Sequence, residues 1–337
     1  MKSVLVTGPG RTAVVEVEKP VCGPSDVLVR IRACGICGSD GLYIAVGGIP
    51  PRQGATPLGH EPAGEIAEVG AEVEGLSVGD HVVLNPMASG DGIIGSGGAQ
   101  GGLSEFVLLR DARVGVHLVT VPKHIPFEVA ALNEPMAVAG HAVNRTAPKP
   151  GDKVVVFGAG PVGLGAAIAY ELRGAHVVVV DIVANRLEKA LRVGAHAVIN
   201  SAEEDVLQRL VEIHGEAPRS FVRGVRPDTD IYLDAAGAPV VLETALAAAK
   251  HGATVGVVAV HKKPVPVDFG ALLTTELTLV LSMGYPTEIF EVTRDLVEHW
   301  QRYELLISDR IPHADVRRAL ELGSTPGAAE KVVVTLG

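Results

Sequence analysis

Lys153-Val-Val-Val-Phe157-Gly-Ala-Gly-Pro-Val-Gly163 is an apolar run that passes directly into a glycine-rich turn, and residues 164–172 after it have helical character. This order of strand, turn and helix is the context that a GxGxxG dinucleotide fingerprint requires. The first glycine allows the tight turn, the second lets the backbone approach a pyrophosphate, and the third permits close packing of helix on strand. Free N–H groups at the helix start favour an anion. The candidate cofactor-binding residues in this turn are Gly158, Gly160, Val162 and Gly163.

The segments that follow continue the alternation of strands and helices. Strands are expected over 175–181, 197–199, 230–234 and 253–259, and helices over 184–193 and 240–250. Because nearly all of these strands are apolar throughout, they indicate a parallel sheet covered by helices on both faces. The fold class predicted for this part is α/β, a Rossmann doubly wound parallel sheet.

Asp181 ends the strand expected over 175–181, and it lies 18 residues after Gly163. A carboxylate at this place can accept hydrogen bonds from the adenosine ribose, and it would repel a 2′-phosphate. The sequence therefore favours NAD over NADP. Two plainer interpretations stay open: Asp181 as an ordinary exposed carboxylate at a strand end, and a Rossmann-like sheet that binds no nucleotide.

The pattern differs on either side of this region. Residues 1–147 are rich in short β-branched runs bounded by Gly, Pro and Asp, which is typical of β-structure. After about residue 284 the alternation fades, with a helix expected over 287–303 and a closing strand over 330–335. We therefore expect one domain from residues 1–147 and 286–337, and a second from residues 148–285.

Composition limits the classes of function. The chain has 337 residues, 47% of them hydrophobic and 20% charged, which suits a globular protein with ample core. Its formal net charge of −10 argues against nucleic acid or an anionic membrane surface as partner. No uninterrupted apolar run of about 18 residues and no signal-peptide pattern are found. Three cysteines do not make a disulfide framework, so a cytoplasmic location is expected.

Cys37-Gly-Ser-Asp40 and Gly59-His60-Glu61 together supply a thiolate, an imidazole and a carboxylate, three ligand types that zinc accepts. Mixed ligands are typical of catalytic zinc sites, whereas structural sites are usually closed by four Cys or His. Taken alone, His60 would be read as a buried histidine satisfied by hydrogen bonds. Cys34 forms a CxxC with Cys37, but no second CxxC exists to complete a Cys₄ site, so Cys34 is expected as a small buried hydrophobe.

Glu134 is an acidic residue within the apolar run Ala131-Leu-Asn-Glu-Pro135. A buried carboxylate is costly unless it is paired or bound to metal, which makes Glu134 a further candidate ligand or a group that hydrogen-bonds a ligand. The alternative is a carboxylate stabilised by the dipole at a helix N-terminus. The residues alone leave both interpretations open.

At this point the chain resembles the zinc-dependent medium-chain dehydrogenase/reductase family over essentially its whole length. The motifs that carry the resemblance are Gly35-Ile-Cys-Gly-Ser-Asp40, Gly59-His-Glu-Pro-Ala-Gly64, Val78-Gly-Asp-His-Val-Val83, Gly102-Leu-Ser-Glu-Phe106, the nucleotide fingerprint and Lys331-Val-Val-Val334. Within the family, the segment around Glu134 looks like the branch of sorbitol, threonine and 2,3-butanediol dehydrogenases. The resemblance implies a GroES-like β-rich catalytic domain with zinc and a Rossmann domain that binds NAD.

The resemblance also implies roles for single residues. Cys37, His60 and Glu61 are similar to the catalytic zinc ligands, and Glu134 matches a position that ligates zinc directly or through water. Ser39 matches the hydroxyl that relays the substrate proton, and Asp40 a carboxylate that orients a ligand. Asp181 and Arg186 match residues that hold the adenosine ribose.

The chain departs from the family pattern at two places. Many members carry four cysteines after the Gly-Asp-His-Val strand for a structural zinc, but residues 86–102 contain none. We therefore expect one catalytic zinc per chain and no structural zinc. Many members also have a histidine at the position of Leu42, which passes protons to solvent, so the proton must leave this site by another route.

The sequence thus predicts a zinc-dependent enzyme that transfers hydride between NAD(H) and a secondary alcohol, diol or polyol and its ketone. The alternatives are a zinc-free NADPH-dependent quinone or enoyl reductase on the same fold, and a non-catalytic nucleotide-binding protein. The expected partners are the small alcohol or ketone substrate and further copies of the chain, with a homotetramer favoured over a dimer.

Overall fold

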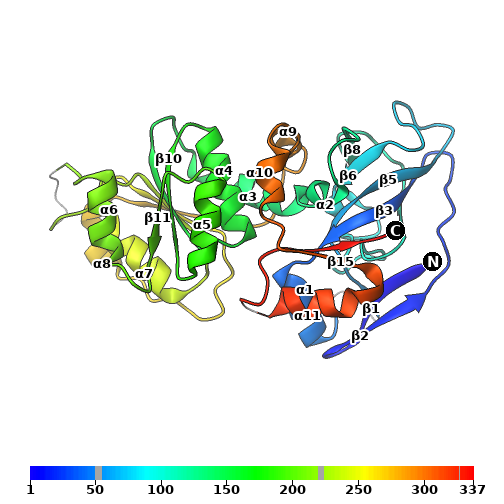
Figure 1. Ribbon diagram of the computed structural model, residues 1–337, viewed down its shortest axis with the longest axis horizontal. Coiled ribbons are helices and arrows are strands. Elements are labelled where there is room, and N and C mark those ends of the chain that lie inside the picture. The colour runs from blue at the N-terminus through cyan, green and yellow to red at the C-terminus, as the bar shows by residue number, and fades with distance from the viewer. Residues whose placement is uncertain (50–54, 219–223, 326) are drawn as a thin grey trace. The chain divides into compact units, whose positions relative to one another are not determined.

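The computed structural model describes residues 1–49, 55–218, 224–325 and 327–337. The chain divides into two compact units (Figure 1). The first unit comprises residues 1–134 and 289–337, and the second comprises residues 135–288. The domain boundaries expected from the sequence, at residues 147 and 285, stay a prediction, because a compact unit need not coincide with a domain.

The first unit is built mainly of β-structure. Its strands are β1 (Lys2–Gly8), β2 (Arg11–Glu16), β3 (Val27–Gly35), β4 (Thr56–Pro57), β5 (Glu61–Val69), β6 (His81–Leu84), β7 (Phe106–Leu109), β8 (Leu118–Val121), β15 (Asp309–Pro312) and β16 (Val332–Thr335). Its helices are α1 (Gly38–Val46), α2 (Phe127–Ala130), α9 (Glu291–Glu298), α10 (Trp300–Glu304) and α11 (Val316–Ser324), with short 3₁₀ turns η1 (Pro86–Ala88) and η3 (His313–Asp315). This confirms the predicted β-rich character of the N-terminal part.

Two sheets organise these strands. Seven strands form one sheet in the order β15-β16-β3-β5-β6-β8, with β7 also paired to β3, and β2-β1-β4 form the other. β3 lies in the middle of the larger sheet, and its apolar side chains, such as Val29 and Ile31, are buried in the core. Because side chains alternate between the two faces of a strand, the register of β3 decides which residues meet beyond its end.

The C-terminal segment of the first unit differs in one respect from the expected single helix over 287–303. The structure has two helices there, α9 and α10, which are separated at His299. His299 has φ −118° and ψ 28°, outside the helical region, so the hydrogen-bond ladder is interrupted at this residue. The expectation of one helix was wrong, because the helical spacing of apolar side chains continues through His299 although its backbone is not helical.

The second unit has the predicted doubly wound α/β architecture (Figure 1). Its strands are β9 (Lys153–Phe157), β10 (His176–Asp181), β11 (Ala197–Asn200), β12 (Ile231–Asp234), β13 (Thr254–Val257) and β14 (Thr278–Leu281). Its helices are α3 (Asn133–Thr146, which begins at the end of the first unit), α4 (Pro161–Leu172), α5 (Ala184–Arg192), α6 (Val206–His214), α7 (Pro239–Ala248) and α8 (Phe269–Leu272), with the 3₁₀ turn η2 (Leu273–Thr275).

The six strands are parallel and lie in the order β11-β10-β9-β12-β13-β14. In chain order this is 3-2-1-4-5-6, the strand order of a Rossmann sheet. Strand order reverses between β9 and β12, and ligands of such sheets bind outside the carboxyl ends of the strands at this point. The turn after β9 and the end of β10 therefore lie where a dinucleotide is expected.

Three histidines cluster in the second unit. His176 begins β10, and its ring centroid lies 4.3 Å from that of His196 and 5.6 Å from that of His214. His214 ends α6, is only 4% exposed, and its Nδ1 lies 2.7 Å from the hydroxyl of Thr229. Burial, followed by the nearby positive charge of His176 and Lys153, lowers the pKa of His214 to about 4. The protein must therefore fold with this ring neutral.

We expect the second unit to lose stability in mild acid because of His214. Its pKa is about 6.5 in the unfolded chain and about 4 in the folded protein. Below pH 6.5 the unfolded chain therefore binds the proton more readily, and stability falls until the folded group also titrates. The loss at low pH is expected to reach up to about 3 kcal/mol. Urea unfolding at several pH values should show a smaller pH dependence for His214→Gln than for the wild type.

The matched control for this measurement is His124→Gln, because His124 is exposed. This variant should keep the wild-type pH dependence. The same slope in the wild type and His214→Gln would show that His214 does not cause the acid sensitivity.

Candidate functional site

The Cys37-Gly-Ser-Asp40 segment forms the start of helix α1. Cys37 is the N-cap residue, with extended backbone, and its N–H donates to Asp40 Oδ2 at 2.9 Å. Asp40 is completely buried, which places a carboxylate inside the first turn. This cap fixes where the helix begins and holds the Cys37 side chain just beyond the end of β3.

Glu61 begins β5, which lies beside β3, and His60 directly precedes this strand. The register pairs Gly35 with Glu61 and Cys34 with Pro62. His60 is 7% exposed and Glu61 is 1% exposed. One ligand atom each from Cys37, His60 and Glu61 lies within 4.8 Å of the others, and no other such group of three or more exists among the described residues. Strand register therefore brings together three of the residues that the sequence selected.

The His60 ring lies between a hydroxyl and a carboxylate. Nε2 is 3.3 Å from Ser39 Oγ, and Nδ1 is 3.5 Å from Asp40 Oδ1. Burial lowers the pKa of His60, but the charges and hydrogen bonds of Asp40 and Cys37 outweigh it and raise the pKa well above the ordinary value. A metal-bound histidine usually directs its second nitrogen to a carboxylate or carbonyl. Asp40 stands at that place, which leaves Nε2 for a metal.

These donors fit a zinc ion. Glu61 Oε1 is buried and has no hydrogen-bond partner among the described residues. Buried polar atoms without partners are unfavourable, so such a group indicates a missing ligand. A thiolate, an imidazole and a carboxylate form a donor set that suits zinc and leaves a position for water or substrate.

Glu134 lies in the first turn of α3 and is 9% exposed. It is not one of the three residues whose ligand atoms cluster. Its charge acts on Lys331, which pairs with Glu61, so Glu134 lies within electrostatic range of the cluster. The structure thus combines the two features that the sequence left as alternatives, a helix N-terminal position and a place near the candidate ligands.

Sequence reasoning missed Lys331 as a site residue. Lys331 is 3% exposed, its ammonium forms an ion pair with Glu61, and it donates to the carbonyl of Ile36 at 3.0 Å. Burial lowers its pKa, but the charges of Glu61, Cys37 and Glu134 outweigh burial and raise it. The local signal was weak, because a lysine in front of a valine run reads as the exposed start of a strand.

The glycine-rich turn of the second unit has the geometry of a dinucleotide site. Gly158 has φ +98°, a left-handed conformation that favours glycine. Gly160 is the N-cap of α4, and Val162 lies half-buried in its first turn. At Gly163 a Cβ would lie 1.8 Å from the carbonyl oxygen of Gly158. The turn and the helix can approach this closely only because Gly163 has no side chain.

Asp181 links this turn to the end of β10. Its Oδ2 accepts from the N–H of Ala159 at 2.7 Å, and its Oδ1 accepts from Ile182 and Val183 at 2.7 and 2.9 Å. These bonds fix the carboxylate beside the turn, and its remaining lone pairs can accept from a sugar hydroxyl. Arg186 lies partly exposed in α5, close along the chain.

A second carboxylate at this edge of the sheet was also missed. Asp234 ends β12, and its Oδ1 accepts from the N–H groups of Ala236 and Gly237, both at 2.9 Å. Its Oδ2 lies 2.7 Å from His261 Nε2. An aspartate at the end of an apolar strand was a visible signal, but nothing in the sequence pointed to His261 as its partner.

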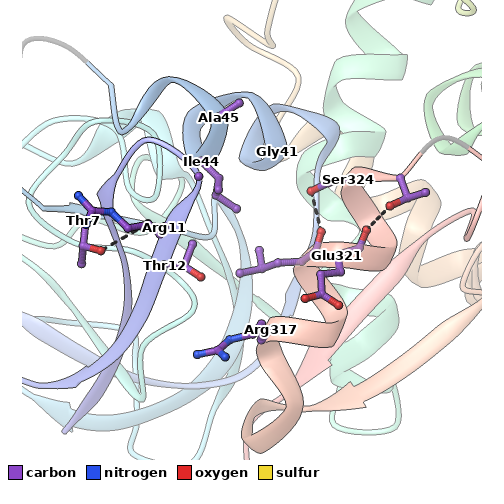
Figure 2. A pocket seen from close by; sticks show the side chains of 12 residues that line it. Thr7, Arg11, Thr12, Gly41, Ile44, Ala45, Arg317, Glu321 and Ser324 are labelled. Carbon is purple, nitrogen blue, oxygen red and sulfur yellow. Dashed lines mark hydrogen bonds between the residues drawn. The ribbon is translucent and has the colours of Figure 1, made fainter.

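A separate hollow of about 760 Å³ lies on the first unit between the β1–β2 turn, α1 and α11 (Figure 2). Arg11 and Arg317 border it, with Ile44 and Leu320 on its walls. None of the residues selected from the sequence as site residues lines it. It is therefore not the candidate site.

The surroundings of the ligand cluster match two further expectations. Cys34 is completely buried in the hydrophobic core of the first unit, as predicted for a small apolar residue. Burial also raises the pKa of its thiol, followed by the charges of Glu61 and Asp40. Leu42 is 58% exposed on α1, where its side chain offers no proton carrier.

Two family models match most of the chain. Residues 23–123 match the alcohol dehydrogenase GroES-like domain, and residues 161–299 match the zinc-binding dehydrogenase model. The first match confirms the predicted GroES-like fold of the β-rich part.

Two curated relatives match this chain over about four fifths of its length and of theirs. The chain is 31% identical to (R,R)-butanediol dehydrogenase of Bacillus subtilis over 84% of each chain. It is 32% identical to sorbitol dehydrogenase of the same organism, over 80% of this chain and 78% of the relative.

Solved structures have the same fold with bound nucleotides. A zinc-binding dehydrogenase of Sinorhizobium meliloti 1021 bound to NADP has a TM-score of 0.83 and 27% identity, over 99% of this chain and 98% of that chain. A short chain alcohol dehydrogenase of Escherichia coli CFT073 complexed with NADH has a TM-score of 0.83 and 25% identity, over 99% of both chains.

In the described part of the present chain, no helix is long and apolar enough to cross a membrane.

We expect Gly163→Ala to destabilise the second unit even without ligand. The new methyl group would collide with the backbone of Gly158, and such overpacking typically lowers the free energy of unfolding by about 1–3 kcal/mol. Gly160→Ala is the matched control, because a Cβ there meets nothing within 4 Å. Thermal unfolding of the ligand-free proteins should separate the two variants. Equal melting temperatures would contradict the packing role of Gly163.

Proposed function

Because the chain belongs to the zinc-binding alcohol dehydrogenase family, we propose that it oxidises a secondary alcohol, diol or polyol to the ketone, with zinc and NAD⁺, and catalyses the reverse reduction. The family membership confirms the resemblance to the zinc-dependent medium-chain dehydrogenases. The observation that carries the proposal is the cluster of Cys37, His60 and Glu61, with ligand atoms within 4.8 Å of one another and Ser39 beside them.

In this proposal Cys37, His60 and Glu61 hold one zinc ion per chain. Asp40 orients His60, and Glu134 is a further ligand or a hydrogen-bonding group beside the ion. When bound, zinc acts as a Lewis acid that lowers the pKa of a bound hydroxyl or water to about 7. Residues 86–102 hold no cysteine, so we propose that there is no structural zinc.

Ser39 takes the proton of the substrate hydroxyl. Its Oγ lies 3.3 Å from His60 Nε2, the nitrogen left for the metal, so Ser39 stands beside the place where a substrate hydroxyl would bind. Leu42 cannot carry the proton further, because its side chain is apolar. The proton must therefore leave Ser39 by a route that does not use residue 42.

We propose NAD as the cofactor, held by the turn residues Gly158, Gly160, Val162 and Gly163 and, at the ribose, by Asp181 and Arg186. The two solved structures above hold NADP and NADH respectively, so the likeness alone does not choose between them. The argument for NAD is the Asp181 carboxylate, which is fixed by three backbone N–H groups and would repel a 2′-phosphate.

The proposed substrate is a secondary alcohol or small diol. By its name, the relative (R,R)-butanediol dehydrogenase acts on a small diol, whereas the relative sorbitol dehydrogenase acts on a sugar alcohol. Leu42 is exposed, and Tyr43 is held by a hydrogen bond of 2.9 Å between its hydroxyl and Ser96. Leu42 lies in α1, whose first turn follows the proposed ligand Cys37. Its apolar side chain offers no hydrogen bond to the many hydroxyl groups of a long sugar alcohol, so a small substrate suits it better.

We also propose a cytoplasmic homo-oligomer, a tetramer in preference to a dimer. β14 is the edge strand of its sheet and pairs only with β13 among the described strands. Leu281 and Met283 at this edge are 67% and 82% exposed. An exposed apolar edge is a template for pairing with a second copy of the sheet. The three cysteines are unpaired in the structure, which suits a reducing compartment.

The zinc-dependent function is tested by Cys37→Ala. We expect this variant to lose bound zinc, measured by elemental analysis, and to lose more than about 99% of NAD⁺-dependent turnover of secondary alcohols and diols, because the thiolate is one of three ligands. Cys34→Ala is the control: it removes the other thiol of the CxxC, which is buried in the core, and should retain zinc.

Turnover without bound metal would contradict the proposal and favour a zinc-free reductase, especially with NADPH. No turnover of any secondary alcohol or diol by zinc-loaded wild type would favour a non-catalytic nucleotide-binding protein.

Asp181→Ser tests the choice of cofactor. Removing the carboxylate removes both a hydrogen-bond acceptor for the ribose and the repulsion of a 2′-phosphate. We expect kcat/KM for NAD⁺ to fall by about 10- to 100-fold and that for NADP⁺ to rise, since a charged hydrogen bond contributes about 1.5–3 kcal/mol. A wild type that already prefers NADP⁺ would overturn the assignment.

A further inference from the structure

Lys331 has no part in the proposed reaction, yet it is buried beside the metal-binding residues. It is 3% exposed, and its ammonium meets Glu61 and the carbonyl oxygen of Ile36. A buried ammonium is unfavourable unless it is paired and hydrogen-bonded. The position of this cation therefore depends on Glu61, one of the proposed zinc ligands.

Backbone hydrogen bonds hold Lys331 in place on both sides. The N–H of Ser308 donates to the Lys331 carbonyl, and the N–H of Ile36 donates to that of Val332, both at 2.9 Å. β16 then pairs antiparallel with β3, with Val333 opposite Gly35. The ammonium therefore reaches Glu61 from a fixed backbone.

Gly35 provides the space that the ion pair occupies. A Cβ on Gly35 would lie 1.8 Å from Glu61 Oε2 and 3.0 Å from Lys331 Cε. Glu61 Oε2 forms the ion pair with the ammonium, and neither oxygen of this carboxylate has a hydrogen-bond partner among the described residues. Lys331 and an entering metal ion would therefore draw on the same buried carboxylate.

Resting on the zinc site proposed above, we propose that Lys331 is a positioning residue that competes with zinc for Glu61 and thereby weakens zinc binding. In the metal-free protein the ammonium neutralises the buried carboxylate. An entering zinc ion must share Glu61 with it, and two cations at short range in a buried site repel each other. The ammonium thus stabilises the metal-free protein at the expense of zinc affinity.

Lys331→Met tests this role, because methionine removes the charge and fills similar space. We expect the Kd for zinc, measured by competition with a chromophoric chelator, to fall about tenfold or more. The melting temperature of the metal-free variant should also fall, and zinc should raise it by more than in the wild type. Lys331→Arg keeps the charge and should restore a Kd near the wild-type value.

The matched control is Lys153→Met in the second unit. Lys153 is also a partly buried lysine in an ion pair, 2.7 Å from Asp228. Its loss should lower stability but leave the Kd for zinc unchanged. A merely structural effect of losing a buried lysine would appear in both variants, whereas competition for Glu61 would appear only in Lys331→Met.

An unchanged or higher Kd for zinc in Lys331→Met would overturn the proposal. If the metal-free variant does not fold, the same substitution is made in a Glu61→Gln background, where no carboxylate needs a counter-charge. Its effect on the Kd should then be smaller than in the wild type, because the competition for Glu61 is gone and only the repulsion between ammonium and zinc remains. An effect of full size would show that Lys331 does not act through Glu61 and would also overturn the proposal. Failure of the wild type to bind zinc would refute the proposed function itself, whereas zinc-dependent turnover with equal Kd values would refute only the role of Lys331.

Discussion

The pairing of β3 with β5 and β16 is the constraint on which the candidate site depends. β3 ends at Gly35, which lies opposite Glu61 of β5 on one side and Val333 of β16 on the other. A slip of one residue would turn each strand's side chains to the other face of the sheet. The thiolate that follows β3, the carboxylate that begins β5 and the ammonium that precedes β16 meet because of this one register. The chemistry of the centre is therefore set by backbone hydrogen bonds of the sheet.

The sequence predicted best those features that depend on neighbours along the chain. The strand of 153–157, the turn at Gly158 and the carboxylate of Asp181 form one local unit, so their pattern could be recognised and their arrangement in a Rossmann sheet could be predicted. The three clustered residues Cys37, His60 and Glu61 were also found, because their chemical types and short motifs point to zinc. Their closeness in the structure agrees with that choice, while their role as ligands stays a prediction.

What the sequence did not reveal depends on long-range contacts. Lys331 pairs with Glu61 across 270 positions of the chain, and His261 pairs with Asp234 across 27 positions that include α7 and β13. No local pattern distinguishes these residues from exposed ones, since burial of a lysine or histidine becomes visible only when the strands are assembled. The break at His299 was missed although it is local. The helical spacing of apolar residues continues through this position, but the backbone of His299 leaves the helical conformation.

The position of Lys331 has a consequence for how the chain is made. Synthesis proceeds from the N-terminus, so Cys37, His60 and Glu61 are all available long before residue 331 is added. Until then the Glu61 carboxylate has no ammonium beside it, and β3 lacks one of its strand partners. A nascent chain would therefore hold three metal donors without their counter-cation. The charge balance of the centre is completed only when residue 331 has also been made and has reached Glu61.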